Sequence, residues 1–71
     1  MTGCKMLEIW LQEHAGIEFT QATLQLEVTK WQWRFGKHYL PESISRYFRT
    51  VRGRVNCEEV EDRQHKTWVV K

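Results

Sequence analysis

Basic and aromatic side chains alternate through the middle of the chain. Residues 30–54 hold seven Lys and Arg residues against a single carboxylate, Glu42. The aromatic residues between these cations are Trp31, Trp33, Phe35, Tyr39, Tyr47 and Phe48. Because clustered Lys and Arg bind phosphates, this pattern predicts a nucleic-acid-binding face. The alternative is a solvated basic helix without a ligand.

The residues that other chemistries need are scattered. Cys4 and Cys57 form no CxxC unit, and His14, His38 and His65 stand far apart in the sequence. The sequence contains no known motif that pairs a nucleophile with a base. It also contains no known spacing that places two carboxylates across a cleft. We therefore expect no metal, no cofactor and no enzymatic activity.

Length and composition indicate one small globular domain. The 71 residues are 41% hydrophobic and include four Trp. A chain this short supports one compact core, which residues 1–71 would form together. No apolar run reaches the roughly 18 residues of a membrane span, and the first residues lack the apolar stretch of a signal peptide. We expect a cytoplasmic protein, in a bacterium or a host cell, without membrane contact.

Apolar spacing predicts three helices, over residues 3–15, 21–34 and 41–52. Gly16 is placed to end the first helix and Gly36 to end the second. Thr20 is placed to cap the start of the second helix, and Pro41 to begin the third. Ile44, Tyr47, Phe48 and Val51 form the buried stripe of the third helix. The core predicted from the facing stripes consists of Leu7, Trp10, Leu11, Leu24, Val28, Ile44, Phe48 and Val51.

The remaining segments predict strands. Residues 17–19 alternate like a short edge strand, and residues 55–60 and 66–70 are rich in β-branched residues around a polar centre, which predicts a hairpin with a loop of several residues. Successive strand residues face opposite sides. If Val55, Cys57 and Val69 face the helices, Trp68 is therefore exposed to solvent or to a partner.

The element order resembles that of a winged helix-turn-helix domain over about 65 residues. The segment Tyr39–Arg52 looks like a recognition helix and Asp62–Thr67 looks like the tip of a wing. The predicted fold is thus α+β, three helices followed by a β-hairpin wing over residues 54–70. Small winged-helix proteins of phages and mobile elements are similar in size. The resemblance implies sequence-specific binding of double-stranded DNA, by a transcriptional regulator or an accessory of excision or replication.

This resemblance assigns roles to the hydroxyl and basic residues. In the major groove, the third helix would read bases through Ser43, Ser45, Arg46, Arg49 and Thr50. The DNA backbone would be held by Lys30, Arg34, Lys37, Arg52, Arg54, Arg63, His65 and Lys66.

Two other functions stay open. A protein-interaction adaptor would dock a partner, or a second copy of the chain, through its aromatic residues or through the acidic residues Glu58, Glu59, Glu61 and Asp62. Binding of RNA or of single strands would need Trp31, Trp33 or Tyr39 on the surface. Binding to DNA phosphates weakens steeply with salt, and apolar docking does not.

Overall fold

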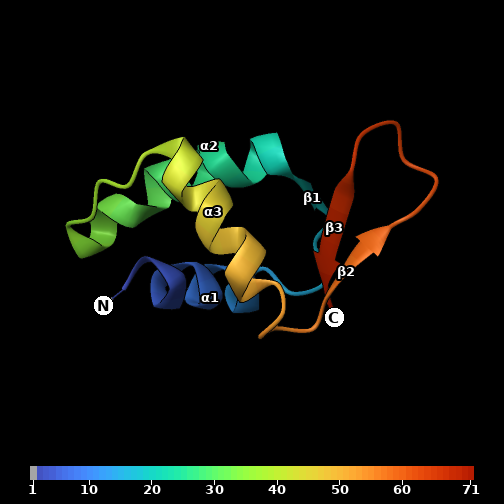
Figure 1. Cartoon of the computed structure of the whole chain (residues 1–71), viewed down its shortest axis with the longest axis horizontal. Helices are drawn as coiled ribbons and strands as arrows, with labels where there is room; N and C mark the ends of the chain where they lie inside the picture. Colours follow the sequence, from blue (N-terminus) through green and yellow to red (C-terminus); the bar gives the residue numbers. More distant parts are fainter. Residues whose placement is uncertain (1) are drawn as a thin grey trace.

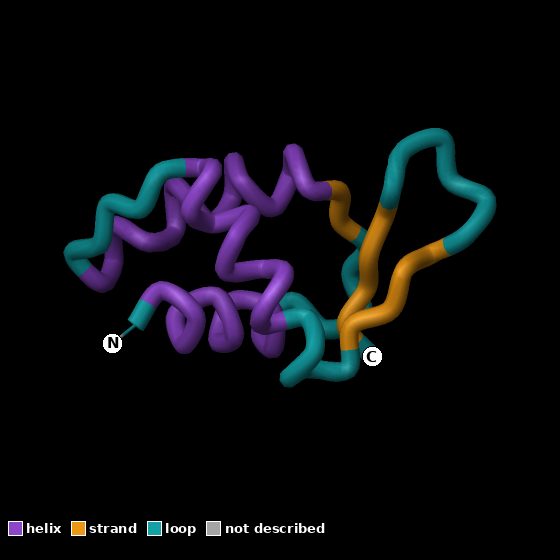
Figure 2. Tube along the Cα trace, in the orientation of Figure 1, coloured by secondary structure: helices purple, strands orange, loops and turns teal. Residues whose placement is uncertain are grey.

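The computed structural model describes residues 2–71, which form a three-stranded antiparallel sheet beside a group of helices (Figure 1). The elements in order are α1 (Gly3–Glu13), β1 (Phe19–Thr20), α2 (Gln21–Trp31), the short 3-10 helix η1 (Gln32–Phe35), α3 (Pro41–Val51), β2 (Cys57–Val60) and β3 (Thr67–Val70). The helices lie at one end of the molecule and the sheet at the other, and a long loop projects from the sheet between β2 and β3 (Figure 2). The predicted α+β class is confirmed.

Three helix ends confirm the local signals, whereas α1 ends at Glu13, two residues before its predicted end. The Thr20 hydroxyl accepts a hydrogen bond from the Thr23 amide at 3.2 Å, and Pro41 occupies the first turn of α3. Gly36 has a φ of 65°, in the left-handed region that glycine favours. The prediction of α-helix to residue 34 is wrong, because the chain tightens into η1 after Trp31. There the Gly36 amide reaches the carbonyls of Gln32 and Trp33, as in the 3-10 turns that satisfy helix ends.

A buried glutamine fixes the connection between η1 and α3. Gln32 is only 2% exposed, and its side chain forms two hydrogen bonds with one residue. Its Nε2 donates to the Tyr39 carbonyl at 3.0 Å, and its Oε1 accepts from the Tyr39 amide at 2.8 Å. The side-chain amide of Gln32 thus satisfies both backbone groups of Tyr39, as a neighbouring β-strand would. It holds the segment before α3 against the helices.

All eight predicted core residues are buried, which confirms the stripes of the three helices. The core also contains Met6, Phe19 and Val70. Phe48 lies at its centre, with ring centroids 5.8 Å from Phe19 of β1 and 5.4 Å from Trp68 of β3. The aromatic rings therefore join α3 to two strands of the sheet.

The sheet has the order β1-β3-β2, so β3 is the middle strand. Phe19 pairs with Trp68, and Cys57 pairs with Val70. These pairs share the face that packs on the helices, because directly opposed residues project to the same side. The orientation with Val69 inward and Trp68 exposed is therefore wrong: Trp68 is half-buried against Phe48, and Val70 is buried. The strands are also shorter than predicted, with a six-residue loop, Glu61–Lys66, in agreement with the expected absence of a tight turn.

Candidate nucleic-acid interface

The outward face of α3 carries two arginines. Arg46 and Arg49 are three positions apart and exposed, on the side of α3 opposite Ile44 and Val51, which are fully buried. Residues at this spacing are neighbours on a helix surface. The helix thus presents both guanidinium groups to solvent while its apolar stripe holds it on the core.

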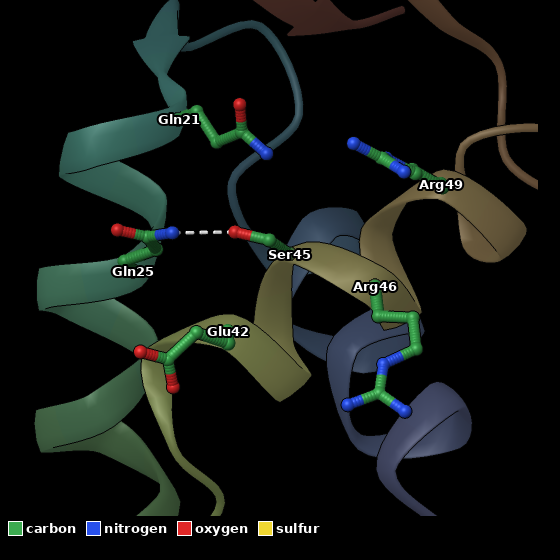
Figure 3. Close-up of a pocket in the computed structure, with 6 residues that line it drawn as sticks. All are labelled: Gln21, Gln25, Glu42, Ser45, Arg46 and Arg49. Atoms are coloured by element: carbon green, nitrogen blue, oxygen red, sulfur yellow. Dashed lines mark hydrogen bonds between the residues drawn. The ribbon is translucent and has the colours of Figure 1, made fainter.

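A groove runs between this face and α2. We call it the α3 groove; its lining residues are Gln21, Gln25, Glu42, Ser45, Arg46 and Arg49. Figure 3 shows the Gln21 amide and the Arg49 guanidinium directed into the same space, with Glu42 at the other end. The Gln25 amide donates a hydrogen bond to the Ser45 hydroxyl, which ties α2 to α3.

A second groove lies between α3 and the hairpin. This wing groove is lined by Gln21, Phe48, Arg49, Arg52, Lys66 and Trp68. It shares Gln21 and Arg49 with the α3 groove, so the two form one continuous surface, the α3–wing surface. A further depression, lined in part by Gln21, His65 and Lys66, extends this surface to the start of the hairpin loop.

The cations of α3 have no acidic partner within the described part of the chain. In residues 2–71, no carboxylate lies within 4.0 Å of Arg46, Arg49 or Arg52. Lys66 has the carboxylate of Glu59 3.8 Å away, and both of these side chains are largely exposed. Exposed pairs of this kind are weak. The α3–wing surface is therefore positively charged and available to an anion.

The structure does not bring all the predicted phosphate contacts to this surface. Lys30 and Arg34 line a separate depression with Trp10, His14 and Trp31. At about 100° per residue, Lys30 is on the opposite side of α2 from Gln21. Lys37 is half-buried in the segment after η1, and Arg54 is exposed in the turn that follows α3.

Arg63 is engaged by a carboxylate from another part of the chain. Its Nε lies 2.9 Å from Oε1 of Glu18, and its second guanidinium nitrogen lies 3.0 Å from Oε2. The hydrogen bond from Arg63 lowers the pKa of Glu18 below its ordinary value. Since Glu18 precedes the inward-facing Phe19, the pair lies on the face of the sheet away from α3. A phosphate would compete with Glu18 for Arg63.

The predicted hydroxyl residues occupy three environments. Ser45 is half-buried and bonded to Gln25, so it lines the α3 groove with its hydroxyl already in use. Ser43 is half-buried and Thr50 exposed, both on the shoulder of α3 away from α2. Of the base-reading residues predicted from the sequence, Ser45, Arg46 and Arg49 share one groove.

Sequence reasoning missed several residues that line the surface, among them Gln21, Gln25, Glu42 and Trp68. The i, i+4 spacing of Gln21 and Gln25 shows that they share one side of α2. Nothing local shows that this side meets α3, because the packing of two helices decides it. Glu42 lies in the first turn of α3, where the positive end of the helix dipole favours its charge.

Within residues 2–71, no three His, Cys, Asp or Glu side chains gather where they could hold a metal ion. No helix in that range has the length and apolar character to cross a bilayer.

Comparison of the chain with protein-family models, with curated proteins and with solved structures gives no match.

Proposed function

We propose that this protein is a winged helix-turn-helix domain that binds double-stranded DNA in a sequence-specific manner. In this proposal α2 and α3 are the helix pair, and β2, β3 and their loop are the wing. The observed layout supports the assignment, since a three-stranded antiparallel sheet lies beside three helices and a loop extends from it. Such a protein regulates transcription or assists excision or replication, in the cytoplasm where its DNA lies.

The observation that carries the proposal is the continuous α3–wing surface with its unpaired arginines. The outward face of α3 enters the major groove, where Arg46 and Arg49 bind guanine edges. Arg52, His65 and Lys66 flank this face and bind backbone phosphates. Gln21 begins α2 beside the surface, where the amides of the first helical turn also favour an anion.

A titration with two substitutions tests both roles. Arg49→Ala removes a base contact, so it should reduce the preference for a site selected from a random pool by about 1–3 kcal/mol and leave random-duplex binding largely intact. Arg52→Ala removes a phosphate contact, so it should weaken binding to all duplexes and reduce the salt slope by about one. Fluorescence anisotropy on selected and random duplexes, at several salt concentrations, measures both effects.

Lys30→Ala is the matched control, because it removes one positive charge on the opposite side of α2. It should leave the preference between sites unchanged and lower affinity less than Arg52→Ala does. The proposal fails if the wild type binds neither duplex at about 50 mM salt, where phosphate-driven affinity is strong.

One observation favours protein interaction as a second candidate function. Trp33 is 66% exposed and Leu40 65% exposed, although both are large apolar residues. Trp31 and Tyr39 are instead half-buried against the core, so of the three aromatic residues expected to stack on single strands, Trp33 is the exposed one. Self-association through Trp33 and Leu40 would appear in sedimentation as a dimer that resists high salt and is lost in Trp33→Ser.

A further inference from the structure

Trp68 joins the hydrophobic core to the wing groove. One side of its indole meets the buried Phe48 ring, with centroids 5.4 Å apart and planes at 79°. The side chain is only half-buried, and it lines the wing groove with Arg49, Arg52 and Lys66. An aromatic ring in this position is fixed by the core while it remains in contact with charged groups.

Two cations lie over this ring. The guanidinium carbon of Arg52 is 5.0 Å from the ring centroid, and the ammonium nitrogen of Lys66 is 5.4 Å from it. Both distances are within the roughly 6 Å range of a cation–π interaction. Arg52 follows the end of α3 and Lys66 precedes β3, so the indole brings together two charges from distant parts of the sequence.

We propose that Trp68 is a positioning residue for phosphate binding, which holds Arg52 and Lys66 so that both bind the DNA backbone; this role rests on the proposed function. Two neighbouring cations repel each other, and the electron-rich face of the indole offsets part of that repulsion. Long basic side chains lose rotamer freedom when they bind. Cations that are already ordered lose less of it, so the duplex is bound more tightly.

Glu59 is the other group that contacts Lys66. It pairs with Trp68 across the hairpin and lies on the same face of the sheet, with its carboxylate 3.8 Å from the Lys66 ammonium. If this ion pair ordered Lys66, Glu59→Gln would weaken duplex binding. If the indole orders Lys66, Glu59→Gln removes a negative charge from the surface and binding is unchanged or tighter.

Two substitutions at Trp68 separate the effect of its aromatic ring from the effect of its apolar packing. Trp68→Leu keeps an apolar group on Phe48 but removes the π face, whereas Trp68→Phe keeps an aromatic ring. We expect Trp68→Leu to lower random-duplex affinity about tenfold at about 50 mM salt and to reduce the salt slope by about one to two. Trp68→Phe should retain most of the wild-type affinity and most of the wild-type salt slope. Leu26→Ala, which removes an exposed apolar side chain of α2 that lines neither groove, should change neither.

Thermal unfolding of each variant shows whether it is folded. If Trp68→Leu is unfolded, biosynthetic replacement of the indoles by fluorinated tryptophan weakens the π face and preserves the packing. The affinity should then fall in the wild type and stay constant in the Arg52→Gln, Lys66→Gln double variant. An equal fall in both proteins would overturn the role of Trp68.

The outcomes distinguish this inference from the function on which it rests. A wild type that binds no duplex overturns the DNA-binding proposal together with the phosphate role. A wild type that binds duplex, with a folded Trp68→Leu of equal affinity and salt slope, overturns the role of Trp68 alone.

Discussion

At the scale of single residues, the buried side chain of Gln32 holds the segment that precedes α3. Its amide is the hydrogen-bonding partner of both backbone groups of Tyr39, within a segment that has no strand to supply them. A buried polar group is tolerated when its hydrogen bonds are satisfied, and Gln32 satisfies its own while it satisfies those of Tyr39.

We therefore expect Gln32→Ala to lower the free energy of unfolding by about 1–3 kcal/mol, since it leaves the Tyr39 amide and carbonyl without their partner. Urea denaturation followed by tryptophan fluorescence measures the change. Gln12→Ala, at an exposed position of α1, is the control and should shift stability by no more than about 0.5 kcal/mol. Equal stability of the two variants would show that water replaces the Gln32 amide.

At the scale of elements, α1 and α3 approach each other closely where Gly3 meets the Tyr47 ring. A Cβ atom at Gly3 would overlap the Tyr47 ring. The same ring packs edge-on against Tyr39, with centroids 5.3 Å apart, so it has little room to move. The glycine thus fixes the distance between the first turn of α1 and the middle of α3.

Gly3→Ala should destabilise the protein by about 1–3 kcal/mol through overpacking, although alanine is the better helix former. Gly53→Ala is the matched control, because a Cβ there meets only the Thr50 carbonyl oxygen at 3.7 Å. Thermal unfolding of the two variants compares them directly. A Gly3→Ala protein as stable as Gly53→Ala would mean that Tyr47 moves aside without cost.

Local signals explain which elements could be predicted. The starts of α2 and α3 followed from Thr20 and Pro41, the end of η1 followed from Gly36, and the buried stripe of α3 followed from its spacing, because each depends on residues within a few positions. The partner of β1 and the face occupied by Trp68 depend on pairing between residues 19 and 68. The α3 groove depends likewise on how Gln21 and Gln25 of α2 meet α3. Such contacts between distant segments leave no local pattern.

At the scale of the whole molecule, Phe48 joins the helices to the sheet. Its ring contacts Phe19 and Trp68, which come from strands that are far apart in the sequence. The helices and the sheet therefore share one hydrophobic core. Because neither layer has a core of its own, we expect the protein to unfold in a single step.

Phe48→Ala should cost about 3–5 kcal/mol, which equals most of the stability of a domain this small. Circular dichroism should show loss of the cooperative thermal transition. Thr50→Ala, an exposed change two positions away on α3, should retain that transition. A sharp, unshifted transition in Phe48→Ala would contradict the placement of Phe48 at the centre of the core.

The place of β3 in the sheet has a consequence for how the protein folds during synthesis. β3 is the middle strand, yet the ribosome makes it after every other element described here. The helices contact one another through segments that are made early, whereas β1 must wait for Trp68 and β2 for Val70. Closing the long loop between β1 and β3 costs entropy before any strand contact repays it, so the sheet forms late. Until β3 emerges, Phe19 and Phe48 lack their neighbour Trp68, and the nascent chain acquires its finished wing groove only in the last step of folding.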